Sequence, residues 1–120
     1  MTQLSKQKDV QGFPSEAIDF SGLIYSASLA DAAAVGITVP STAKNWFVRI
    51  TVETGAICWV SVNATAAVPV AATFGAITSE LINPFKGYEV KVQAADTISV
   101  YNASGAVAEA SISLYVVENA

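Results

Sequence analysis

The stretch Asn45 to Asn63, NWFVRITVETGAICWVSVN, carries the clearest structural signal in the chain. Its apolar side chains recur at every second position: Trp46, Val48, Ile50 and Val52 in the first half, Cys58, Val60 and Val62 in the second. A period of two places successive side chains on opposite faces of a β-strand, so each half has one apolar face. The link between the halves, Glu53 to Ala56, is short and contains a glycine. We therefore predict two strands that fold back on each other as a hairpin.

Alternating apolar and polar residues continue on both sides of this stretch. The further strands are expected at Leu23 to Ala30, Gly36 to Pro40, Ser79 to Pro84, Tyr88 to Gln93, Thr97 to Tyr101 and Ala108 to Glu118. A turn at Ala95-Asp96 is expected to close another hairpin. Seven or eight short strands, separated by Gly, Pro, Asn and Asp, are typical of an antiparallel sandwich or jelly roll. We predict an all-β, single-domain antiparallel β-sandwich, jelly-roll-like, over residues 21–120.

Residues 64–77, ATAAVPVAATFGAI, interrupt the strand pattern. Alanine favours a helix, but Pro69 in the middle of one costs about 3 kcal/mol, and the β-branched residues resist it further. We predict a long loop with extended pieces. In a two-sheet sandwich we expect such a loop to cross one end, where partners are often met.

The composition is that of one domain with little charge. With 120 residues and 12.4 kDa, the chain can bury a core without disulfides or metal. Charged residues make up 13% of it, about half the usual share, and apolar residues 52%. Such a domain should expose weakly polar surface, which usually lies against a partner. The six cations are scattered and the net charge is −4, which argues against direct nucleic-acid binding.

Targeting signals are not evident. No run reaches the ~18 apolar residues of a membrane span, so no membrane partner is expected. The first twenty residues carry charge and lack a continuous apolar core, so we expect no signal peptide and a protein that is not exported. Cys58 lies on an apolar strand face and has no second cysteine to pair with, so we interpret it as a small buried hydrophobe.

Residue types that carry chemistry are scarce. The chain contains no histidine, and it therefore lacks the commonest general base and metal ligand. The ten carboxylates are spread singly, and the seven glycines form no phosphate-binding loop. We expect no catalytic site, no metal site and no cofactor. Trp46 and Trp59 alternate with strand residues, which favours the core or the sheet surface over a sugar-stacking platform.

Two sets of residues are candidates for contact with a partner. Residues 1–20 are polar, and Gly12-Phe13-Pro14 argues against a continuous helix, so we predict an extended N-terminal arm. Two interpretations stay open for it: a disordered terminus, or an arm that lies on a neighbouring subunit. The second uses Phe13, Ile18 and Phe20 as anchors. Within the sandwich, Tyr101 and Tyr115 each lie on the face of their strand that is opposite its apolar face. They are the candidate interface residues.

From about Gly22 to Val117 the chain resembles the small β-sandwich proteins of tailed-bacteriophage virions, above all head decoration or cement proteins. The resemblance is carried by a polar arm, NWFVRITVETGAICWVSVNATA, a small-residue loop, LINPFKGYEVKVQAADTISVYNASG and a last strand that ends the chain. It implies a non-enzymatic structural protein without cofactors, made in the host cytoplasm and placed on the capsid surface of the virion. There it would bind the major capsid protein and stabilise the head as a homo-oligomer, with a trimer favoured.

A binding module is the alternative. In that interpretation the same sandwich belongs to a phage fibre or an adhesin, and loops such as residues 64–77 meet a glycan or a host surface. Clustered exposed aromatic residues around a defined groove would favour it.

Overall fold

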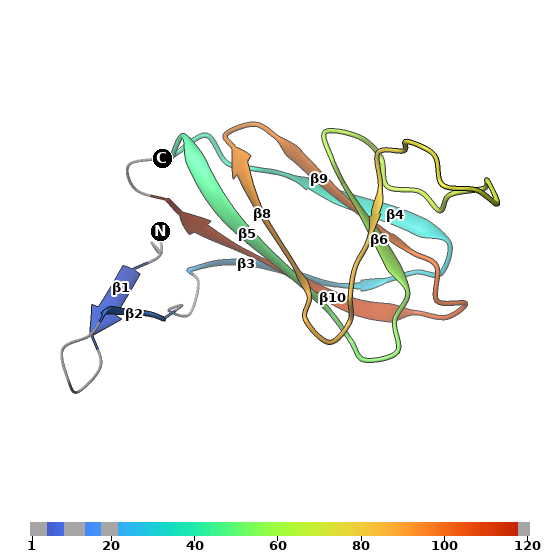
Figure 1. Ribbon diagram of the computed structural model, residues 1–120, viewed down its shortest axis with the longest axis horizontal. Coiled ribbons are helices and arrows are strands. Elements are labelled where there is room, and N and C mark those ends of the chain that lie inside the picture. The colour runs from blue at the N-terminus through green and yellow to red at the C-terminus, as the bar shows by residue number, and fades with distance from the viewer. Residues whose placement is uncertain (1–4, 9–13, 18–21, 118–120) are drawn as a thin grey trace.

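The computed structural model describes residues 5–8, 14–17 and 22–117, and every regular element in this part of the chain is a β-strand (Figure 1). Two four-stranded antiparallel sheets form the sandwich. The first sheet contains, in spatial order, β3 (Leu23–Leu29), β10 (Ala108–Val116), β5 (Asn45–Val52) and β8 (Tyr88–Gln93). The second contains β4 (Ala33–Thr38), β9 (Thr97–Asn102), β6 (Cys58–Val62) and β7 (Glu80–Leu81). The predicted all-β antiparallel sandwich is confirmed.

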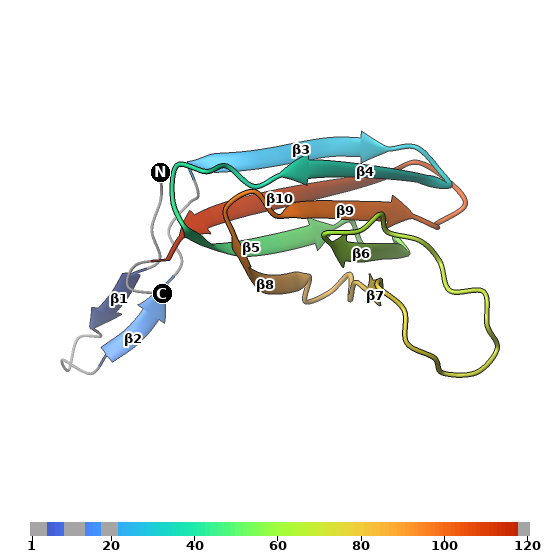
Figure 2. The same cartoon turned by 90° about the horizontal axis from the view of Figure 1, so that it is seen from above.

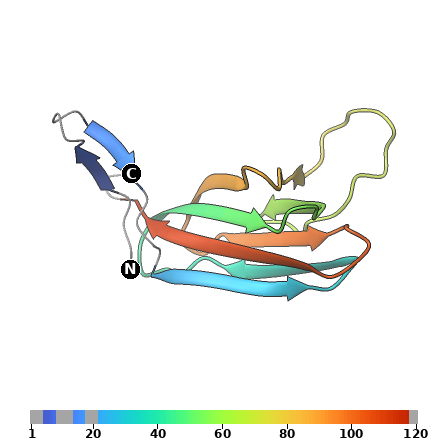
Figure 3. The same ribbon diagram turned by 90° about the horizontal axis from the view of Figure 1, so that it is seen from below.

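Consecutive strands alternate between the two sheets along most of the chain. From β3 to β10, only β6 and β7 are sequence neighbours that share a sheet. This interleaved order is that of a jelly roll. Figures 2 and 3 show the two layers, with β3 and β4 along one side of the sandwich and β8 and β7 along the other. Each side therefore ends in two edge strands, one from each sheet.

The two predicted hairpins are wrong, because both links cross between the sheets. β5 pairs with β10 and β8, whereas β6 pairs with β9 and β7. In the same way, the turn at Ala95-Asp96 joins β8 in one sheet to β9 in the other. The alternation of apolar and polar residues indicates which face of a strand is apolar, but it does not indicate which other strand pairs with it. A hairpin would leave both apolar faces on one side of a single sheet, whereas these arches turn the faces toward each other and bury both.

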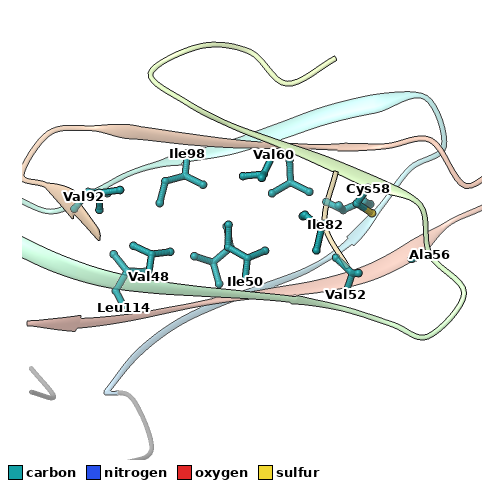
Figure 4. Packing of buried hydrophobic residues seen from close by; sticks show 14 of the residues in the cluster. Val48, Ile50, Val52, Ala56, Cys58, Val60, Ile82, Val92, Ile98 and Leu114 are labelled. Carbon is teal, nitrogen blue, oxygen red and sulfur yellow. The ribbon is translucent and has the colours of Figure 1, made fainter. Parts of the chain in front are cut away.

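The core lies between the facing surfaces of the two sheets (Figure 4). Val48, Ile50 and Leu114 point from the first sheet toward the second, whose facing surface carries Ile98 and Cys58, and all five side chains are inaccessible to solvent. Burial of an aliphatic side chain of this kind contributes about 1.5–3 kcal/mol. The interpretation of Cys58 as a small buried hydrophobe is confirmed.

Several segments depart from their predicted bounds, and β7 keeps only two residues of the predicted Ser79 to Pro84. β4 begins at Ala33, before the predicted Gly36, because it pairs with β9 over six residues and the chain turns at Ala32, where φ is 56°. Residues 63–79 form the long loop that was predicted at residues 64–77, and they connect β6 to its neighbour β7 in the same sheet. Within the predicted extended arm, β1 (Ser5–Lys8) pairs antiparallel with β2 (Pro14–Ala17).

Candidate functional site

The most distinctive surface feature is the segment between β6 and β7, residues 63–79, which we call the β6–β7 loop. It departs from the end of β6 and projects beyond the body of the sandwich before it returns to β7 (Figures 2 and 3). None of its seventeen residues is charged. A projecting loop normally carries polar or charged side chains, because nothing covers it. The loop therefore departs from the usual composition of a projecting segment.

The outer part of the loop exposes large apolar side chains. Val70 and Phe74 are fully exposed, and Val68 and Ile77 are also largely open to solvent. Transfer of apolar surface out of water is worth about 25 cal/mol per Å². The loop therefore exposes four large apolar side chains and no charged one, which makes it the candidate contact surface.

The base of the loop is held firmly by three serine hydroxyls. The backbone N–H of Ala66 donates to Oγ of Ser99 in β9 at 3.0 Å, and the N–H of Ala67 donates to Oγ of Ser79 at 3.0 Å. On the returning side, Oγ of Ser61 in β6 donates to the carbonyl oxygen of Thr78 at 2.9 Å. Ser61 and Ser99 point away from the core yet are buried, and each is hydrogen-bonded to one end of the loop: Ser99 to its start and Ser61 to its end. The base is thus fixed to the sheet and presents the exposed part at a defined place.

A cavity of about 420 Å³ lies between the loop and the sheet. Its wall combines Trp59 of β6 with Pro69, Val70, Phe74 and Ile77 of the loop. Its volume lies within the range of small-molecule sites, which also need a few well-placed polar groups to orient a ligand. The polar side-chain groups of this lining are the Thr73 hydroxyl and the indole N–H of Trp59. This composition suits an apolar side chain of a protein partner better than a sugar or another polar ligand.

The predicted interface tyrosines have different surroundings. Tyr101 lies directly opposite Trp59 in register, and Trp59 lies opposite Leu81, so the three form a row across the outer face of the second sheet, beside the loop. Tyr101 is half-buried in that row. Tyr115 lies in the first sheet, is only 4% exposed and has its ring centroid 6.1 Å from that of Phe47. The single chain therefore offers a partner part of Tyr101 and almost none of Tyr115.

The three predicted arm anchors, Phe13, Ile18 and Phe20, lie outside the described residues. The exposed residues Val70 and Phe74 were not singled out from the sequence, although their segment was named as a place where partners are met. The sequence feature that could have identified them is the absence of charge around Phe74. An aromatic residue in a long uncharged loop does not belong to a core strand and is therefore a candidate for surface contact.

Reactive groups do not gather near this surface. In residues 22–117 and the two short strands before them, no three Cys, Asp or Glu side chains group as a metal site would require. Cys58 is inaccessible, and burial, with a smaller effect of the Glu53 charge, raises the pKa of its thiol. A raised pKa keeps the sulfur protonated and weakly nucleophilic at neutral pH. Among the described residues, no helix is long and apolar enough to span a membrane.

Searches against protein-family models, curated proteins and solved structures found no match to this chain.

Proposed function

We propose that this chain is a structural protein of a virion, without enzymatic activity, that binds the major capsid protein lattice and stabilises the head. The observation that carries the proposal is the β6–β7 loop, whose charge-free outer part exposes Val70 and Phe74 while its base is fixed to the sheet. A surface that must hold a lattice gains affinity from apolar side chains that fill pockets of the partner. It needs no cofactor and no titrating group.

The contact we propose has a specific composition. Phe74 and Val70 insert into an apolar depression of the capsid protein, while the cavity beside Trp59 accepts an apolar side chain in return. Leu81 and Tyr101 extend the same face over the second sheet. The loop has no charge, so binding through it should change little with ionic strength.

Co-sedimentation with capsid shells tests the loop contact. The shells are assembled from the major capsid protein encoded in the same genome. Replacing Val70 and Phe74 together by Ser should weaken binding by about tenfold or more for each side chain, because each loses the burial of a large apolar group. The matched control is Phe85→Ser, since Phe85 is also strongly exposed but lies in the turn between β7 and β8. Equal binding by the loop variant and the wild type would contradict the proposal.

The N-terminal residues 1–20 are proposed as a second contact, with Phe13, Ile18 and Phe20 as anchors. A second attachment on the same molecule acts at high effective concentration and can raise the overall affinity by orders of magnitude. Deletion of residues 1–20 should therefore weaken shell binding while leaving residues 22–117 folded. If the truncated protein binds shells as well as the full chain, this part of the proposal is wrong.

A glycan- or host-surface-binding module is the second candidate, and the half-buried Trp59 beside the loop cavity is the observation that favours it. Sugar recognition combines stacking on an aromatic ring with hydrogen bonds from neighbouring polar groups. A glycan screen with the wild type and Trp59→Ala separates the two candidates. Glycan binding that is lost in the variant, without any shell binding, would replace the capsid proposal.

A further inference from the structure

The two sides of the sandwich differ in how their edge strands are protected. On one side, β7 is only two residues long and β8 carries Glu89 and Lys91. Short length and charged side chains are the usual devices that prevent an edge from pairing with another molecule. On the other side, β3 has seven residues and β4 has six, and neither contains a charged residue or a proline. The β3–β4 side is thus long, regular and unprotected.

The space between β3 and β4 is open to solvent. β3 neighbours only β10, and β4 neighbours only β9, among the strands that the structure describes. Between the two edges lies an apolar groove of about 210 Å³. Tyr25 and Val35 line it, and they are 37% and 47% exposed although register places both on the inner faces of their sheets. Core-facing side chains that remain this exposed indicate that something else covers this side.

We infer that the cover is a second copy of this chain, whose β3 pairs antiparallel with β3 of the first about a two-fold axis. A two-fold brings each strand against itself, so any charge near the axis would face an identical charge. The sequence LIYSASL avoids this conflict completely. It also matches large residues with small ones when centred on Ser26: Tyr25 lies opposite the partner's Ala27, and Ile24 lies opposite the partner's Ser28.

The same asymmetry closes the assembly at two copies. Pairing of β3 with β3 uses the β3–β4 side of both molecules at once and covers the groove between them. What remains outside is the β7–β8 side, where β7 is short and β8 carries charged residues, and this side resists further strand addition. A head-to-tail contact between unlike sides would instead leave an open edge at each end and continue into a filament or a ring. The inference goes beyond the proposed capsid role and does not involve the β6–β7 loop.

Charge placement at the axis tests the inference. The full-length wild type should sediment at twice the 12.4 kDa chain mass at micromolar concentration. Ser26→Lys and Ser26→Glu, each alone, should weaken dimerisation by about tenfold or more, because each puts two like charges opposite one another. A mixture of the two variants should recover the dimer, because opposite charges then meet. Ser26 is exposed, so neither substitution disturbs the fold of the single chain.

Thr51→Lys is the matched control. Thr51 lies in the same row on the same sheet face, since it pairs with Ser111, which in turn pairs with Ser26. Its position in the inner strand β5 keeps the added charge away from the proposed axis, and the dimer should persist. A wild-type monomer, a trimer, an open-ended polymer or a dimer unaffected by both Ser26 variants would each overturn the inference. None of these measurements uses capsid shells. The dimer inference can therefore be disproved while the capsid proposal stands, and the capsid proposal can be disproved while the dimer inference stands.

Discussion

The side-chain amide of Asn102 in β9 donates a hydrogen bond of 3.0 Å to the carbonyl oxygen of Leu29 at the end of β3, so that a polar bond joins the two sheets inside the fold. Asn102 is inaccessible to solvent, and its amide also donates to the carbonyl oxygen of Ala106 at 2.8 Å, while its Oδ1 accepts from the N–H of Ser104 at 3.0 Å. One buried side chain thus organises the turn before β4 and the turn before β10.

Asn102→Ala should lower the free energy of unfolding by about 2–4 kcal/mol, because it leaves buried carbonyl groups without donors and opens a small cavity. Urea titration at neutral pH measures this change. Gln93→Ala removes a side-chain amide that is exposed and should change the free energy by less than about 0.5 kcal/mol. Similar losses in the two variants would show that the buried network contributes nothing particular.

Gly87 is expected to tolerate no side chain. Its φ is 75°, and a Cβ built there would lie 2.6 Å from the carbonyl oxygen of Ile50. Gly87→Ala should destabilise the chain by about 2–4 kcal/mol, because the left-handed backbone and the steric overlap with β5 both add cost. The control is Gly75→Ala in the β6–β7 loop, where no atom lies within 4 Å of the added Cβ. If the thermal midpoints of both variants equal that of the wild type, the close approach at Gly87 is not real.

The Oγ of Ser99 holds the base of the β6–β7 loop. Ser99→Ala should remove the acceptor of the Ala66 N–H and cost about 1 kcal/mol. Amide hydrogen exchange should accelerate at Ala66 more than in the strands, because the loop base opens locally. Ser111→Ala removes a hydroxyl bonded to Ser26 on an exposed sheet face and should leave the exchange of Ala66 unchanged. Unaltered exchange in Ser99→Ala would mean that other contacts hold the loop.

Stability should decline in alkaline solution. Burial raises the pKa of the Cys58 thiol, and burial, with a hydrogen bond and a charge from Glu80, raises that of the Tyr88 hydroxyl. A raised folded-state pKa stabilises the fold below the unfolded-state value, and this contribution is lost as pH rises through the folded-state value. For Cys58 the loss should begin above about pH 8.5, and for Tyr88 above about pH 10, each with a slope of at most about 1.4 kcal/mol per pH unit.

Cys58→Ala and Tyr88→Phe separate the two contributions. Urea titrations at neutral and alkaline pH should show that Cys58→Ala removes the part of the decline that begins near pH 8.5. Tyr88→Phe should remove only the part above about pH 10. Stability curves that run parallel to that of the wild type at all pH values would show that neither group is coupled to folding.

The candidate site was only partly accessible from the sequence. The loop at residues 64–77 and its lack of charge could be recognised, since proline and β-branched residues act locally. The exposure of Phe74 and the burial of Ser61 and Ser99 could not, because they depend on which sheet face the loop covers. Tyr115 shows the same limit: alternation places it on the outer face, but Phe47 of the neighbouring strand packs against it.

Local chemistry was enough to establish the strands and their faces. Steric rules make side chains alternate, so Val48, Ile50 and Val60 could be assigned to a core before any pairing was known. Which strands pair depends on contacts between residues far apart in the sequence, such as those of β10 with β5. It also depends on how the apolar faces of the strands become buried against each other. Because of these long-range contacts, the links that were expected to form hairpins connect the two sheets instead, and β3 and β4 are edge strands. The tertiary arrangement therefore decided the jelly-roll order and the surfaces on which partners are proposed to bind.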